Sequence, residues 1–144
     1  MEQLPDEAKE RIELLLHAGG AFETAGDFDS ALARYAAAFE QVPEPKTDWN
    51  VSSLIMSNIG STFFLKGYFQ AGADSLRLAL QCVQGPGNSF IHLRLGQVEL
   101  ELDNRAAAIE HLTIAYQQEG EEIFEEENPK YLAFLKKVRP ALVG

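Results

Sequence analysis

Three glycines recur at similar intervals inside apolar, helix-forming stretches of the chain. They are Gly19, Gly60 and Gly96, which lie 41 and 36 residues apart. A period of about 20 to 50 residues indicates repeated structural units, each of which buries its apolar face against its neighbours.

The chain is predicted to be almost entirely helical. Ala, Leu, Glu and Gln dominate, apolar residues recur at spacings of three and four, and no segment alternates as a half-buried strand would. Glycine, proline and asparagine interrupt the pattern near residues 26, 43–48, 67, 85–88 and 103–104. We expect helices at about 5–25, 29–41, 49–66, 69–83, 89–102, 105–119 and 129–138.

On this period the chain resembles the tetratricopeptide-repeat family. Repeats of that family span about 34 residues and have the pattern W-x2-L-G-x2-Y, then A-x3-F, then P. The first unit matches with Leu15, Ala18, Gly19, Phe22, Ala31, Tyr35, Ala38 and Pro43. The small residues Ala31 and Ala38 are expected where helices approach closely, with Tyr35 filling the space beside them.

The second and third units match with departures. Their matching residues are Met56, Ile59, Gly60, Phe63, Gly72, Leu76 and Ala79, and then His92, Leu95, Gly96, Ala108, Leu112 and Ala115. In the third unit Glu99 stands where an aromatic residue is usual, and Gly120 replaces the proline. A generic helical bundle with alanine-rich packing is the alternative interpretation.

The resemblance implies an all-α fold, a right-handed superhelical stack of antiparallel helix pairs (an α-solenoid). It implies a single domain over residues 1–144. The repeats are expected at about 8–43, 49–84 and 88–120, followed by a capping helix at about 128–139. The residues inserted between the first two repeats fall in PEPKTD, which is expected to be a surface loop.

The resemblance also implies a binding site, because the first helices of successive repeats in the family line a concave groove for a peptide or a partner helix. The corresponding positions are Leu16, Glu23, Leu54, Ser57, Asn58, Ser61, Phe64, Phe90, Leu93, Arg94, Gln97 and Leu100. Some family members bind a peptide carboxylate through lysines in this groove. Those lysines are absent here, where Leu16, Ser57 and Leu93 stand instead, so binding of a chaperone tail is not expected.

Two interpretations of the large groove side chains remain open at this point. If they face the partner, replacing Phe64 and Leu93 by glutamate should abolish binding and leave the helices intact. If they belong to the core, as Phe90 and Leu100 also could, the same change should unfold the chain. Trp49, which follows the loop, is either an exposed anchor for a partner or a packing residue at a helix start.

The charge of the chain bears on its partner. The sequence has 22 acidic and 12 basic residues and a net charge of −10, which argues against nucleic acid and suits a neutral or basic protein. Six glutamates lie between Glu119 and Glu127, in a segment that either docks a basic partner or is a solvated connection.

We therefore expect a non-catalytic protein–protein interaction scaffold that binds a protein or peptide. The alternative is an acidic immunity or inhibitor protein that neutralises a basic toxin of a bacterial competition system. Apolar patches at the open ends of a short stack also allow a homodimer.

No motif for catalysis, a cofactor or a metal is found. His17, His92 and His111 lie on three different predicted helices, and no glycine loop for phosphate or calcium loop is present. The single cysteine, Cys82, excludes an internal disulfide and fits a reducing compartment. The N-terminal residues do not resemble a signal peptide, and no apolar run is long enough for a membrane helix. We expect a cytoplasmic protein that is not an enzyme and binds neither cofactor, metal nor membrane.

Overall fold

The computed structural model describes residues 3–143, and within them the chain forms helices and no strand. The six longer helices come in pairs, α1 (Asp6–Thr24) with α2 (Phe28–Glu40), α3 (Asn50–Lys66) with α4 (Phe69–Gln81), and α5 (Ser89–Glu101) with α6 (Arg105–Glu119). After them come the 3-10 helix η2 (Gly120–Phe124), α7 (Pro129–Val138) and the short α8 (Pro140–Val143). The expected all-α fold is confirmed, and the ends of the longer helices lie within about two residues of the predicted positions.

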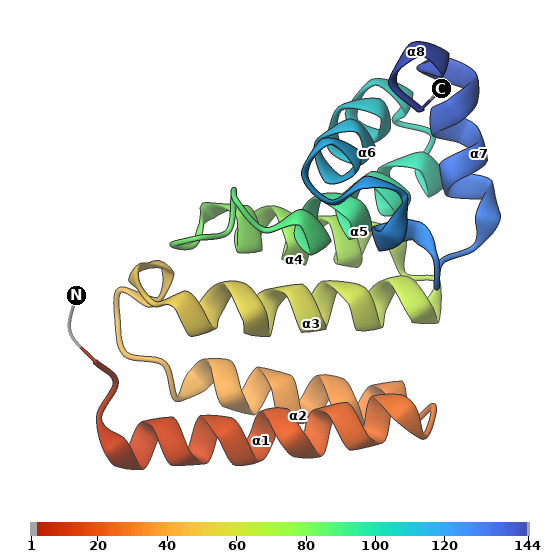
Figure 1. Ribbon diagram of the computed structural model, residues 1–144. Helices are drawn as coiled ribbons and strands as arrows, with labels where there is room; N and C mark the ends of the chain where they lie inside the picture. Colours follow the sequence, from red (N-terminus) through yellow and green to blue (C-terminus); the bar gives the residue numbers. More distant parts are fainter. Residues whose placement is uncertain (1–2, 144) are drawn as a thin grey trace.

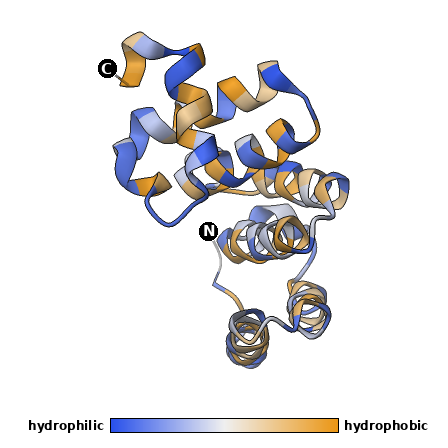
Figure 2. Cartoon of the chain, turned by 90° about the vertical axis from the view of Figure 1, so that its right-hand side faces the viewer, coloured by the Kyte–Doolittle hydropathy of each residue, from blue (hydrophilic) through white to orange (hydrophobic). Residues whose placement is uncertain are grey.

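Successive helix pairs stack on one another. The second helix of each pair packs against the first helix of the next, α2 on α3 and α4 on α5, as Figure 1 shows from red to green. Figure 2 shows the lower helices nearly end-on and the upper ones from the side, so successive pairs are rotated relative to each other. Three apolar clusters form the core and share half-buried side chains such as Phe39, Ile59 and Phe64. This arrangement is the stack of antiparallel pairs that the repeat predicts.

The three periodic glycines mark the closest approach of the two helices in each pair. A Cβ atom placed on Gly60 would lie 2.5 Å from Cγ of Leu76, and one on Gly96 would lie 2.7 Å from Cγ of Leu112. On Gly19 it would meet the ring of Tyr35, which is 3% exposed. No side chain fits at any of the three without a shift of its neighbours, which explains why glycine recurs there.

We expect opposite effects from alanine at two adjacent glycines of α1. Gly19→Ala should lower the free energy of unfolding by about 1–3 kcal/mol, because its Cβ overpacks the buried ring of Tyr35. Gly20→Ala should raise it by roughly 0.5–1 kcal/mol, because nothing lies within 4 Å of its Cβ and alanine is the better helix former. Urea denaturation of both variants checks the prediction, and equal shifts would contradict it.

The inserted loop after α2 is held in place by Lys46. Its ammonium group donates to the carbonyls of Phe39 at 2.8 Å and Val42 at 2.6 Å, at and just after the C-terminus of α2, where a positive charge is favourable. The backbone N–H of Val83 donates to the carbonyl of Thr47 at 2.9 Å and joins the loop to the chain after α4. The predicted surface loop therefore contains a short 3-10 helix, η1 (Lys46–Asp48), and connects two repeats.

Two further expectations are resolved by the packing. Trp49 is half-buried beside the cluster that contains Ile12 and Ile55, which agrees with the packing interpretation. Glu99, the departure in the third repeat, is 2% exposed and forms an ion pair with Arg77 of α4. Its second oxygen accepts from Nδ2 of Asn104 at 2.8 Å. The carboxylate thus ties together two helices and a turn where the family usually places an aromatic ring.

Candidate functional site

One face of α3 carries solvent-exposed side chains near both ends of the helix. Leu54, Asn58 and Leu65 recur at helical spacing on this face, and the two leucines are 50% and 48% exposed. Most other residues in the middle of α3, including Ser57 and Thr62, are buried against neighbouring helices. We call Leu54, Asn58 and Leu65 the open face of α3.

The neighbouring face of α5 is largely covered. Phe90, Arg94, Gln97 and Glu101 share this face at spacings of four, three and four. Arg94 is 8% exposed and Gln97 is fully buried, whereas Phe90 at the helix start is 37% exposed. The covering residues come from the chain itself, from the segment that leads into α7.

Arg94 is the centre of a polar network between three segments. Its Nε donates to Oγ of Ser61 on α3 at 3.1 Å, and its Nη1 donates to Gln97 at 2.8 Å and to Glu127 at 2.6 Å. Nε2 of Gln97 donates to the same Glu127 oxygen at 2.9 Å. The carboxylate of Glu127 is thus held against α5 by one charged and one neutral donor.

Aromatic rings complete the surroundings of this guanidinium. It lies 4.9 Å from the centroid of the Phe64 ring and 5.0 Å from that of Phe90, so both rings contribute cation–π attraction. A hollow of about 380 Å³ lies beside it and is lined by Phe64, Leu65 and Tyr131 among others. Arg94 is therefore fixed by stacking and by hydrogen bonds before any partner arrives.

Two polar contacts to Glu101 hold α7 against the C-terminal end of α5. The hydroxyl of Tyr131 donates to Glu101 at 2.8 Å, and the ammonium of Lys130 pairs with the same oxygen at 2.7 Å. Burial alone would raise the pKa of Glu101, but the hydrogen bonds from Lys130 and Tyr131 lower it below its usual value. Burial, and then the bond to Glu101, raise the pKa of Tyr131. Both groups thus stay in the protonation states that hold α7 in place.

The structure distributes the twelve predicted groove residues over three environments. On the exposed or half-buried surface near α3 and α5 lie Leu54, Asn58, Phe64, Phe90 and Leu100. Inside the protein lie Ser57, Ser61, Leu93, Arg94 and Gln97. In the first pair, Leu16 packs against the cluster around Ile12, and Glu23 accepts from Tyr35 at 3.2 Å and from Thr62 at 2.9 Å.

Several of the predicted groove residues are therefore too buried to contact a partner. Leu93 is 1% exposed and packs with Leu112, Phe124 and Tyr131, so its side chain belongs to the core. Gln97 is fully buried and already bonded to Glu127. Glu23 joins α1, α2 and α3, and burial, followed by the charge of Glu23, raises the pKa of Tyr35 to about 12. These three side chains have structural partners, whereas Leu54, Asn58 and Phe90 remain accessible.

Sequence reasoning missed several residues of this site, chiefly Leu65, Glu101, Glu127 and Tyr131. Helical spacing could have found two of them, because Leu65 follows Leu54 by eleven residues and Glu101 follows Phe90 by the same number. No periodic signal exists for Glu127, which lies outside any α-helix.

Two histidines form a pair between α5 and α6 on the other side of the third repeat. Nε2 of His92 lies 2.7 Å from the carbonyl of Pro86 and therefore donates to it, while the two Nδ1 atoms lie 3.0 Å apart. One Nδ1–H of a neutral pair can satisfy this contact, but two protonated rings would point N–H groups at each other. Burial, and then the nearby charge of His92, lower the pKa of His111. Glu110, Glu99 and Arg77 are the other charged groups that act on the pKa of His111.

We expect this pair to make stability depend on pH. Because the pKa of His111 is lowered in the folded state, the unfolded chain binds the proton first as the pH falls below about 6.5. The free energy of unfolding should thus be highest above that pH, and it should decrease as the pH falls towards the lowered pKa of His111 in the folded state. The free energy of unfolding, measured by urea denaturation at several pH values in this range, should depend less steeply on pH in His111→Asn. This substitution keeps a polar atom near the position of Nδ1. The exposed His17→Asn is the control and should leave the slope unchanged.

Three other kinds of feature could mark a function within the described residues: a metal cluster, a membrane-spanning helix and the cysteine. Among residues 3–143, no three His, Cys, Asp or Glu side chains are grouped so as to hold a metal ion. None of the described helices is long and apolar enough to span a bilayer. Cys82 is buried, and burial raises the pKa of its thiol.

Comparisons with known proteins agree on the fold. No family model matches the chain. Among curated proteins, the BBSome complex member BBS4 of Mus musculus is 34% identical over 101 residues, which are 70% of this chain. The chain spans only 18% of the length of that relative.

Solved structures match over nearly the whole chain. The first TPR domain of Spaghetti (RPAP3), bound to the HSP90 peptide SRMEEVD, has a TM-score of 0.69 at 17% identity and covers 94% of this chain and 95% of its own. The Arabidopsis OM64 TPR domain has a TM-score of 0.70 at 18% identity, with coverages of 92% and 98%. MamA has a TM-score of 0.64 at 18% identity, with coverages of 88% and 75%. Together with the periodic glycines and the stacked helix pairs, these matches show that the chain has the tetratricopeptide-repeat fold.

Proposed function

We propose that the chain is a non-catalytic binding module that holds a segment of another protein against the side formed by α3 and α5. The observation that carries this proposal is the open face of α3, where two leucines about half exposed flank Asn58. Exposed apolar side chains beside a few polar groups are typical of peptide-binding surfaces.

The comparisons support a protein or peptide as the bound partner. Folds of this kind generally mediate protein–protein interactions, and the RPAP3 domain was solved with a peptide bound. BBS4 is named as a member of a complex. We do not propose the peptide of the RPAP3 structure as the ligand, because the family resemblance places Leu16, Ser57 and Leu93 where carboxylate-binding lysines would stand, and Leu93 is buried here.

The test is a selection of peptides on the folded chain, followed by calorimetric titration of the best binder. Leu54→Glu should weaken its binding at least tenfold, because a charge would then occupy the centre of an apolar contact. Leu14→Glu is the matched control, since Leu14 is 65% exposed but lies on α1, away from the open face of α3. Equal losses in both variants, or failure to select any binder, would contradict the proposal.

A second candidate function is neutralisation of one basic protein, the inhibitor alternative. It is favoured by Glu119, Glu122, Glu125 and Glu126, none of which lies within 4.0 Å of a cationic side-chain nitrogen among residues 3–143. Affinity purification at low and high salt separates the candidates, because charge-driven capture of a single basic protein should be lost as salt increases. Binding that persists at high salt would favour the apolar face.

A further inference from the structure

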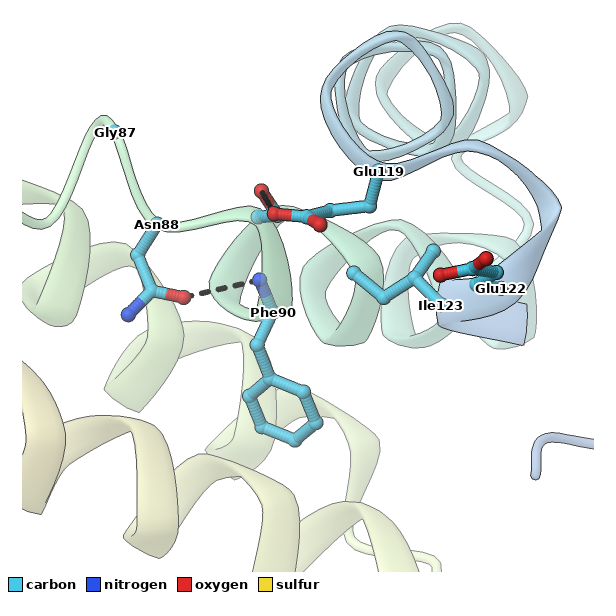
Figure 3. A pocket seen from close by; sticks show the side chains of 7 residues that line it. Gly87, Asn88, Phe90, Glu119, Glu122 and Ile123 are labelled. Atoms are coloured by element: carbon cyan, nitrogen blue, oxygen red, sulfur yellow. Dashed lines mark hydrogen bonds between the residues drawn. The ribbon is translucent and has the colours of Figure 1, made fainter. Parts of the chain in front are cut away.

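The acidic segment, residues 119–127, and the start of α5 line two adjoining open hollows, which we call the channel. One hollow of about 510 Å³ and another of about 280 Å³ are both lined by Phe90, Glu122 and Ile123. Figure 3 shows the first of them, with Glu119 and Ile123 on one side of Phe90 and Asn88 on the other. The channel leads from the α4–α5 loop towards the site of Arg94, because the second hollow is also lined by Leu93 and Glu127.

The charge of this channel is almost entirely negative. Its lining carboxylates are Glu119, Glu122, Glu125, Glu126 and Glu127. Among these five carboxylates, only Glu127 forms an ion pair within the described residues. Its partner is Arg94, whose charge is neutralised by this pair. The other carboxylates are exposed, and each lacks a cationic side-chain nitrogen within ion-pair distance among the described residues.

An anionic ligand does not fit at this place. The free N–H groups at the start of a helix can bind an anion, but here Oδ1 of Asn88 accepts from Phe90 N at 2.9 Å and from Ile91 N at 3.2 Å. Figure 3 shows the first of these bonds. The surrounding carboxylates would in addition repel a negative charge.

The channel also has an apolar part. Phe90 is 37% exposed and Ile123 is half-buried, and both line the two hollows. The guanidinium of Arg94 stacks on the Phe90 ring at 5.0 Å and so helps to fix the ring. An apolar side chain of a partner can therefore contact Phe90 and Ile123 while carboxylates stand on both sides of it.

We propose that this channel binds a basic segment of the partner protein, in which lysine or arginine residues flank an apolar residue. The apolar side chain contacts Phe90 and Ile123, and the cationic side chains pair with Glu119, Glu122, Glu125 and Glu126. The inference rests on the proposed function and specifies its partner. It also joins two residues of the predicted groove, Phe90 and Leu93, to the acidic segment in one site, although the sequence offers the groove and that segment as separate binding surfaces.

The test uses a short synthetic peptide in which lysines flank a central leucine, with both ends blocked. Its binding to the full chain is measured by fluorescence anisotropy at low and high salt, beside an isomer with glutamate in place of each lysine. We expect binding of the lysine peptide only, weakened by added salt. Glu122→Gln with Glu125→Gln should weaken it roughly tenfold, since two charge pairs are lost, and Phe90→Ala should weaken it by a similar factor.

The control removes the same charge elsewhere. Glu40→Gln with Glu44→Gln changes two exposed glutamates near the end of α2, outside the channel, and should leave the affinity within about twofold. Equal weakening in both double variants would overturn the inference, because the peptide would then respond to net charge alone. Binding of the glutamate isomer would overturn it as well.

The outcome also separates this inference from the proposed function. If selected peptides lose binding with Leu54→Glu but not with the Glu122 and Glu125 double variant, the binding module stands and the basic partner is wrong. If neither change affects any peptide, both proposals fail. A photo-reactive residue in place of Phe90 that cross-links to the lysine peptide supports the channel directly.

Discussion

Leu93→Glu is expected to unfold the third helix pair. The side chain of Leu93 is 1% exposed and packs under Phe124 and Tyr131, so a carboxylate there would be buried without a partner. The cost should exceed about 4 kcal/mol, which is comparable to the whole stability of a small domain. Far-UV circular dichroism and urea denaturation measure the loss of helix directly.

This expectation follows the core interpretation of these side chains, and not the groove interpretation in which glutamate at Phe64 and Leu93 leaves the helices intact. Phe64 is half-buried and stacks on Arg94, and its ring centroid lies 6.2 Å from that of Tyr131, so it too contributes to packing. Leu93→Ala should cost about 2–5 kcal/mol, as cavities in cores generally do. Leu54→Glu should cost less than about 1 kcal/mol, and helicity retained in Leu93→Glu would show that this side chain is not in the core.

Arg94→Leu is expected to have the second largest effect. It leaves the carboxylate of Glu127 without its cation. It also removes the hydrogen-bond donor to Oε1 of Gln97 and to Oγ of Ser61. Removing one partner of a largely buried pair costs about 3–5 kcal/mol, and the partial exposure of Glu127 places the expected loss near the lower end of this range. Urea denaturation at neutral pH is the measurement.

Two further variants define the origin of that loss. Arg94→Lys keeps the charge but cannot bind Ser61, Gln97 and Glu127 together, so it should lose an intermediate amount of stability. Arg139→Leu removes an exposed arginine that is in no ion pair of the described chain, and should stay within about 0.5 kcal/mol of the parent. If Arg94→Leu behaves like Arg139→Leu, the network does not hold the acidic segment.

Most of the fold follows from local signals in the sequence. The glycine period locates the helix pairs because close helix contact excludes a side chain at the same place in every repeat, as at Gly60 and Gly96. The boundaries of α7 follow from Asn128, whose side chain accepts from Lys130 N, and from Pro129 at the first helical position.

The site could be predicted only in part, because its composition depends on contacts between distant residues. Helical spacing identifies which residues share a face of α5, but it does not say what covers that face. The segment that covers it has no helical period, and its position is fixed by the pairing of Glu127 with Arg94, 33 residues earlier in the chain. Leu93 therefore matched a groove position in sequence and is nevertheless buried.

The reach of α7 has a consequence for how the chain unfolds. In an ideal helical array each unit touches only its neighbours, so one end can melt while the remainder persists. Here Tyr131 of α7 lies against Phe64 in the second pair, and Glu127 and Ser61 share the same guanidinium. Detaching the last helices breaks contacts two units away, which couples the fraying end to the middle of the stack. The second pair, the third pair and α7 should therefore unfold together as one cooperative unit.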